Sequence, residues 1–194
     1  MLRNIMIMAF LMIAFACNNT VNNQQKLADN TRDSLQKIAG TIISKTFDTL
    51  KATLTRTIAD SGLEKAISIC NTNAAILEKT YSNQDISLRR VSTKFRNNNN
   101  APDVLEAEWL RSYASGDSIS LTGKTHIDAS KNEFHFYKPI IVAPLCLSCH
   151  GTPQKDIPDE VFSKINLLYP NDKATGYKKD DLRGIWHVVI KYKQ

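Results

Sequence analysis

Apolar residues recur every three or four positions through much of the N-terminal half of the chain, which is the spacing of one face of an α-helix. The pattern predicts one long helix or two abutting helices over residues 25–60 and a further helix over residues 63–81. Gly62 separates them as a helix stop signal. Pro102 is predicted to open another helix, since its ring suits the first helical position, and Gly116 to end it. The buried stripe of this helix would be Leu105, Trp109 and Tyr113.

Strand patterns prevail in the second half of the chain. Residues 86–92, 134–137 and 185–192 are predicted as strands from their β-branched, aromatic and alternating positions. A short helix is predicted over residues 158–168. Because helices come first and strands mainly later, the order predicts an α+β fold with long N-terminal helices followed by an antiparallel sheet. No linker divides residues 25–194, so we expect a single domain there.

The N-terminal segment has the pattern of an export signal. After Arg3, residues 5–16 form an uninterrupted apolar run of 12 residues, which is too short to span a bilayer but suits the core of a signal peptide. Residues 1–16 are therefore predicted to be a signal peptide. With or without attachment of a lipid, such a signal would export the protein across a bacterial membrane.

Small residues at Ala14 and Ala16 directly before Cys17 are similar to a lipobox, in which a lipid is attached to the cysteine and the chain is cut before it. Residues 17–24 would then be a lipidated tether, and the protein would be lipid-anchored on the periplasmic side of a membrane. The alternative is ordinary secretion after cleavage behind Ala16.

The amino-acid composition and charge of the chain limit the kinds of molecule that it is expected to bind. The chain is 42% hydrophobic and 23% charged, which is typical of a globular domain. Its 25 Lys and Arg against 19 Asp and Glu give a formal charge of +6. No run of Lys or Arg exceeds two residues and no stacking-aromatic motif accompanies them, so we expect no nucleic-acid partner.

The candidate chemistry lies at Cys146, Cys149 and His150, which form a C-x-x-C-H motif, the signature of covalent c-type haem attachment. On a helical turn the two thiols share one face and can add to two haem vinyl groups, while the adjacent imidazole reaches the iron. We therefore expect one covalent haem c per chain. Two alternatives stay open, a thioredoxin-like redox dithiol and half of a structural zinc site, although no second C-x-x-C or H-x-x-H completes a zinc set.

The second axial ligand can be narrowed by elimination. All four Met residues lie within the signal peptide, so a His/Met haem is excluded in the mature chain. The remaining candidates are a Lys, no strong protein ligand, or one of Cys70, His126, His135 and His187. Of the four cysteines, Cys17 would carry lipid and Cys146 and Cys149 would carry haem, so Cys70 is left as the favoured ligand. A buried structural cysteine is the competing interpretation.

Four blocks of residues carry a family resemblance, in the order Ala66-Ile67-Ser68-Ile69-Cys70, Arg90-Val91-Ser92-Thr93-Lys94-Phe95-Arg96-Asn97, Tyr137-Lys138-Pro139-Ile140 with the C-x-x-C-H motif and Gly151, and Ala174-Thr175-Gly176-Tyr177. With these blocks the chain resembles a family of single-haem c-type proteins with a PAS-like fold, long known as a bacterial domain of unknown function. The resemblance implies His150 as proximal and Cys70 as distal ligand of the iron.

Basic residues near the motif are candidates for compensating the haem propionates. Lys94 and Arg96 lie beside the Asn-rich residues 97–100, and Lys138 and Arg183 are further candidates. The competing interpretation for each is a solvated surface charge.

These expectations favour a membrane-anchored periplasmic haem protein, not an enzyme, that senses redox state or a small ligand through a low-potential His/Cys haem. PAS-like folds are often sensors, although fold analogy is a weak warrant. Such a sensor needs a separate redox or signalling partner, because no output domain lies on the chain. The alternatives are a one-electron carrier and, without haem, a thiol oxidoreductase using Cys146 and Cys149. A peroxidase is less favoured, because it would need an open coordination position on the iron, which a Cys70 ligand would occupy.

Overall fold

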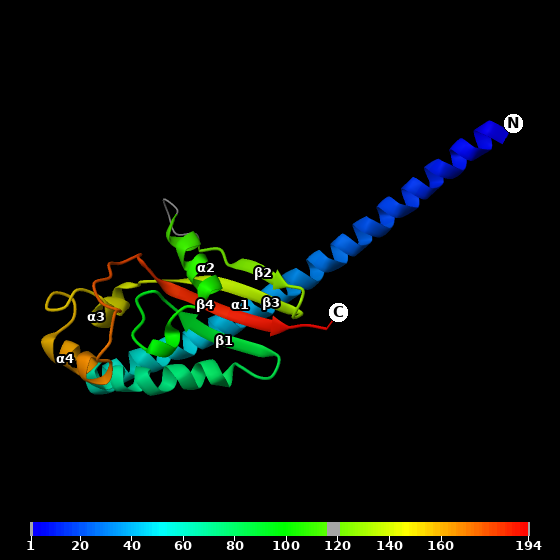
Figure 1. The fold of residues 1–194 in the computed structure, drawn as a ribbon. Coiled ribbons are helices and arrows are strands. Elements are labelled where there is room, and N and C mark those ends of the chain that lie inside the picture. Colours follow the sequence, from blue (N-terminus) through cyan, green and yellow to red (C-terminus); the bar gives the residue numbers. More distant parts are fainter. Residues whose placement is uncertain (1, 116–120, 194) are drawn as a thin grey trace. The chain divides into compact units, whose positions relative to one another are not determined.

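The computed structural model describes residues 2–115 and 121–193, and the side chains of residues 29–69, 76–115 and 121–193. The chain divides into two compact units, residues 1–38 and residues 39–194. The first is a helical segment, and the second holds the sheet and the remaining helices (Figure 1). The predicted signal peptide, tether and Cys17 have side chains outside the described residues. Within the described part of the chain, no helix is long and apolar enough to cross a membrane.

Helix α1 spans Leu2–Thr80 and is broken at one residue. Gly62 has φ +78° and ψ 175°, a conformation that glycine adopts without the steric cost of a side chain. The predicted helices on either side of Gly62 are thereby confirmed as two segments. Within the second unit, Ala39, Ile43 and Ala66 of α1 are buried.

The sheet has four antiparallel strands in the order β1-β4-β3-β2 (Figure 1). Strands β1 (Ile86–Val91), β3 (Glu133–Ile141) and β4 (Leu182–Lys191) overlap the three predicted strands. Strand β3 extends beyond both predicted ends, β4 begins three residues earlier, and β1 and β4 each end one residue earlier than predicted. The α+β prediction is confirmed. Strand β2 (Lys124–Asp128) was not predicted, because its residues are mostly polar and lie at the edge of the sheet.

Helix α2 (Val104–Ala114) packs on one face of the sheet (Figure 1). Leu110 and Tyr113 join Val91, Tyr137 and Ile185 in one apolar cluster. The helix begins two residues later than the Pro102 prediction implies, because Asp103 is its N-cap. The Asp103 carboxylate accepts from the backbone N–H of Glu106, and the Glu106 carboxylate accepts from that of Asp103, a capping box that satisfies two backbone donors.

The opposite face of the sheet is also buried. Its buried apolar side chains, each at most 6% exposed, include Leu88, Phe134, Phe136, Trp186, Val188 and Ile190. Arg90 on this face donates to the Glu78 carboxylate at 2.7 Å, which ties β1 to the last turns of α1. Helix α4 (Asp159–Leu168) confirms the predicted short helix, and its Val161 and Ile165 pack with Ile67 of α1.

Candidate functional site

The C-x-x-C-H motif lies on a short helical turn between β3 and α4. A 3-10 turn η2 (Pro144–Cys146) leads directly into helix α3 (Leu147–His150). Cys146 is the N-cap residue of α3 and Cys149 follows it by three positions, so the two sulfurs belong to one helical face. The predicted arrangement of the motif on a helical turn is confirmed.

The two cysteines pack against different parts of the fold, and both are half-buried. Cys149 joins the cluster of Ile67, Ile157, Val161 and Ile165, which links α1 to α4. Cys146 packs with Val142, Ala174 and Tyr177. Apolar side chains of α1, the α4 region, Val142 and residues 174–177 therefore pack against the motif.

The His150 imidazole is oriented by the backbone. Its Nδ1 lies 2.7 Å from the carbonyl oxygen of Ala174. Because a carbonyl only accepts, Nδ1 carries the proton and Nε2 keeps its lone pair. Burial, together with the positive charges of Arg183 and Arg96, holds the pKa of His150 well below its ordinary value. His150 is therefore a neutral imidazole whose Nε2 has a free lone pair, the form that binds a metal.

The chain segment after α4 is bound to the motif through its backbone. The N–H of Gly176 donates to the carbonyl of Gly151, and that of Tyr177 donates to the carbonyl of His150, at 2.8 and 3.0 Å. Gly176 has φ +75°, which allows the chain to turn there. Gly151 allows a close approach: a Cβ at this position would lie 2.5 Å from Cβ of Asp156.

Arg96 is at the centre of this assembly. Its guanidinium binds both oxygens of Asp172, at 3.1 and 3.0 Å, and donates to the Cys149 carbonyl at 2.7 Å. It also reaches the Ala174 carbonyl at 3.4 Å. The side chains of Arg96 and Asp172 are 12% and 4% exposed, so this ion pair is largely shielded from water. The described contacts of Arg96 are thus with protein groups next to His150.

Two further cations lie beside the motif. Lys94 donates to the Thr175 carbonyl at 2.5 Å, and its ammonium lies 4.3 Å from the centre of the Tyr177 ring. Arg183 donates to the Lys94 carbonyl and lies over the same ring at 5.4 Å. Burial, with the neighbouring charges of Arg96 and Arg90, lowers the pKa of Arg183. Arg183 is thus a buried cation among other positive charges, an environment that favours the binding of a negative group nearby.

Cys70 is in the second segment of α1. Its side chain lies outside the described residues. Ile67 precedes it by three positions, and Ile67 packs in the same cluster as Cys149. The backbone of α1 therefore passes the C-x-x-C-H motif within one helical turn of position 70.

The other candidate histidines lie on or beside the sheet and contact residues other than His150. His187 and His135, on the sheet face that α2 covers, are 6% and 9% exposed. Nδ1 of His187 lies 2.7 Å from the Glu106 carboxylate, and its Nε2 lies 3.0 Å from Nδ1 of His135. His126 is exposed on the edge strand β2, with its ring 5.6 Å from that of His135. The described contacts do not bring these three histidines to His150.

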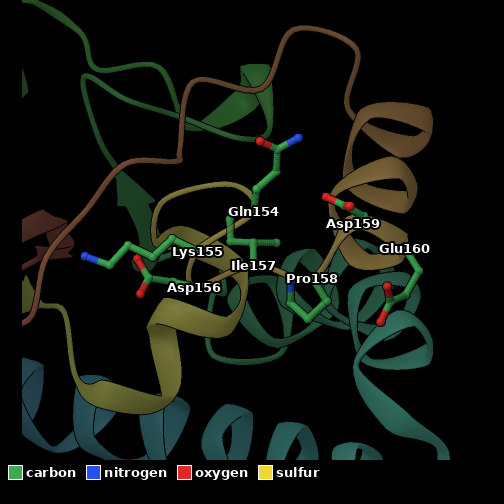
Figure 2. Close-up of a pocket in the computed structure, with 7 residues that line it drawn as sticks. All are labelled: Gln154, Lys155, Asp156, Ile157, Pro158, Asp159 and Glu160. Carbon is green, nitrogen blue, oxygen red and sulfur yellow. The ribbon is translucent and has the colours of Figure 1, made fainter.

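A pocket of about 370 Å³ lies in the loop after the motif (Figure 2). Its lining is one continuous segment, Gln154, Lys155, Asp156, Ile157, Pro158, Asp159 and Glu160. Sites for apolar cofactors are lined mainly by hydrophobic and aromatic side chains. This charged, open pocket therefore differs in character from the apolar surroundings of Cys146 and Cys149.

Comparison with known proteins identifies the family. A family model described as Tll0287-like matches residues 10–191. The chain belongs to the Tll0287-like family. The crystal structure of the cyanobacterial heme-protein Tll0287 is similar to this chain, with 26% sequence identity and a TM-score of 0.56. The match covers 84% of this chain and 97% of that chain. No curated protein matches the chain.

For this member of the Tll0287-like family, sequence patterns missed one participant in the site. Asp172 neutralises Arg96 and also accepts from the backbone N–H of Ala174 at 2.9 Å. Nothing in the surrounding sequence, Asn171-Asp172-Lys173, marks it as more than a loop residue. A buried arginine elsewhere in the chain needs such a carboxylate, but its position becomes evident only in the fold.

Proposed function

We propose that this chain is an exported, lipid-anchored haem protein that carries one covalent haem at Cys146, Cys149 and His150 and responds to redox state or a small ligand. Membership of the Tll0287-like family and similarity to a heme-protein support haem binding. The observation that carries the proposal is the neutral His150, whose Nδ1 is bound to the Ala174 carbonyl and whose Nε2 lone pair stays available beside two thiols.

The thiols are suited to covalent attachment. Each S–H adds across one haem vinyl double bond: a carbon–sulfur bond forms, the thiol proton goes to the other vinyl carbon, and no electron is gained or lost overall. Cys146 and Cys149 present two sulfurs one helical turn apart, as this double addition needs. A bound haem would supply one-electron redox chemistry and an axial coordination position.

We assign the distal ligand to Cys70. The support is its place in α1, one turn after Ile67, which packs with Cys149. A thiolate at Cys70 would favour ferric iron through its negative charge. When a one-electron donor protein reduces the iron, Cys70 would bind it less strongly, and the released thiolate would take up a proton. Loss of that bond would free this part of α1 to move.

Lys94 and Arg183 are the cations we assign to the haem propionates. In the described contacts they bind carbonyl oxygens and the Tyr177 ring, whereas the carboxylates nearby are held by Arg96 and Arg90. Two cations in this environment match the charge of two propionates. A change in the ligands of the iron would have to be transmitted to a separate periplasmic partner protein.

The optical spectrum of the exported protein, oxidised, reduced and then denatured, tests this function. We expect a c-type haem spectrum that survives denaturation. Replacing Cys70 by Ala should change the ferric spectrum and raise the potential, while Lys65→Ala, at an exposed position in the same helix, should change neither.

The outcomes separate the alternatives. Absence of haem under conditions that mature other c-type proteins would refute the proposal and favour a thiol oxidoreductase. An unchanged spectrum in Cys70→Ala would refute the distal assignment. Reduction kinetics that are the same with and without carbon monoxide would favour a simple electron carrier over a sensor.

A further inference from the structure

The contacts of Arg96 and Asp172 extend to both backbone segments that hold the His150 ring. On one side, the Arg96 guanidinium donates to the carbonyl of Cys149, the residue that precedes His150. On the other side, the Asp172 carboxylate accepts from the backbone N–H of Ala174, whose carbonyl accepts from His150 Nδ1. The two side chains are joined by a bidentate ion pair. A closed chain of hydrogen bonds therefore surrounds the imidazole.

This arrangement differs from that of a surface ion pair. Exposed ion pairs contribute little to stability because water screens their charges. The side chains of Arg96 and Asp172 are only 12% and 4% exposed. Bidentate arginine–carboxylate pairs also fix relative orientation, since both groups are planar. The segments they connect, α3 and residues 172–177, are otherwise joined near the ring by the backbone bonds of Gly176 and Tyr177.

We infer that Arg96 and Asp172 act together as a positioning pair for His150: they hold the Ala174 carbonyl on Nδ1 and thereby set the orientation and basicity of the imidazole. The inference rests on the proposed function for its redox consequence. It assigns Arg96 a role other than propionate binding. Neither residue touches the iron; both act through Ala174 and the Cys149 peptide.

The positioning role makes a distinctive prediction for the redox potential. A hydrogen bond from Nδ1–H to a carbonyl makes the imidazole a stronger donor to iron and so favours the ferric state. Loosening that bond should therefore raise the potential. A purely electrostatic role behaves differently: loss of the Arg96 charge would lower the potential, and loss of the Asp172 charge would raise it by a comparable amount.

The double substitution Arg96→Gln/Asp172→Asn separates these roles, because it leaves the net charge unchanged while it removes the bidentate pair. The matched control is Arg90→Gln/Glu78→Gln, which removes the neighbouring ion pair, again without changing net charge. We expect the first variant to have a raised potential and the control to keep that of the parent. An unchanged potential in the first variant, or an equal shift in both, would overturn the inference.

A second measurement does not depend on haem. Hydrogen exchange of the Ala174 and Tyr177 amides reports how firmly residues 172–177 are held to α3. Loss of charge-assisted hydrogen bonds should accelerate it by about tenfold to a hundredfold in the Arg96/Asp172 variant, and not in the control. Unchanged exchange would also overturn the inference.

The two measurements also distinguish the inference from the proposed function. If haem never attaches while exchange accelerates, the proposed function fails and the positioning of His150 stands. If the double variant does not fold, Arg96→Lys replaces it: the charge remains, but an ammonium lacks the planar two-donor geometry that binds Asp172 while also reaching Cys149. Raised potential and faster exchange are expected again, and parent values for both would overturn the inference.

Discussion

Removal of the Glu106 carboxylate in α2 should destabilise the protein measurably. Glu106 is fully buried. It accepts from His187 Nδ1 at 2.7 Å and from the backbone N–H of Asp103 at 2.9 Å, and Arg89 lies 3.4 Å away. Glu106→Ala would leave the buried His187 N–H without its acceptor and would remove half of the capping box.

The magnitude follows from these contacts. A buried donor left without a partner costs about 1–3 kcal/mol. Loss of helix capping costs about 1 kcal/mol. Together we expect a loss of about 3 kcal/mol in the free energy of unfolding, which for a chain of this size lowers the melting temperature by about 6–12 °C. Glu106→Gln retains an acceptor for His187 and should cost less.

Urea unfolding followed by circular dichroism measures this loss. The control is Glu108→Ala, since Glu108 is exposed in the same helix and its replacement should change stability by less than about 0.5 kcal/mol. A loss below about 1 kcal/mol for Glu106→Ala would refute the reasoning that the network carries stability. So would equal losses in the two variants.

Three further predictions test other parts of the molecule. Burial and the neighbouring His187 lower the pKa of His135, so in acid the unfolded chain binds a proton that the native chain does not. The free energy of unfolding should therefore fall as the pH drops below about 6.5. His135→Gln should reduce this pH dependence, measured by urea unfolding at several pH values. Gly151→Ala should cost about 1–3 kcal/mol through the clash with Asp156, whereas Gly40→Ala, with open space around its Cβ, should be neutral or stabilising in the same assay. Cys17→Ser should move the exported protein from the membrane to the soluble fraction; full membrane retention on fractionation would contradict lipid anchoring.

The elements with strong periodicity were predictable from sequence. Trp109 and Tyr113 recur at helical spacing, and both lie on the face of α2 that packs against the sheet. Gly62 was a recognisable break because its left-handed conformation suits glycine. Strand β2 escaped prediction, since an edge strand with polar residues such as Lys124 and His126 has no apolar face to reveal it.

The site divides in a similar way. The spacing of Cys146, Cys149 and His150 was sufficient to predict that they share a helical turn. The partners that orient His150 were not evident, because the acceptor on Ala174 is a backbone carbonyl, which every residue possesses. The pairing of Arg96 with Asp172 joins positions 76 residues apart, and local sequence patterns carry no information about such a contact.

The central position of β4 affects the order in which the chain can fold. This strand is the last element in chain order, yet it lies between β1 and β3 and pairs with both. A chain that emerges N-terminus first therefore presents Cys146 and Cys149 before the sheet can close. During that interval both thiols belong to an open polypeptide, accessible to any machinery that modifies them. Only when β4 pairs with both β1 and β3 is the four-stranded sheet complete.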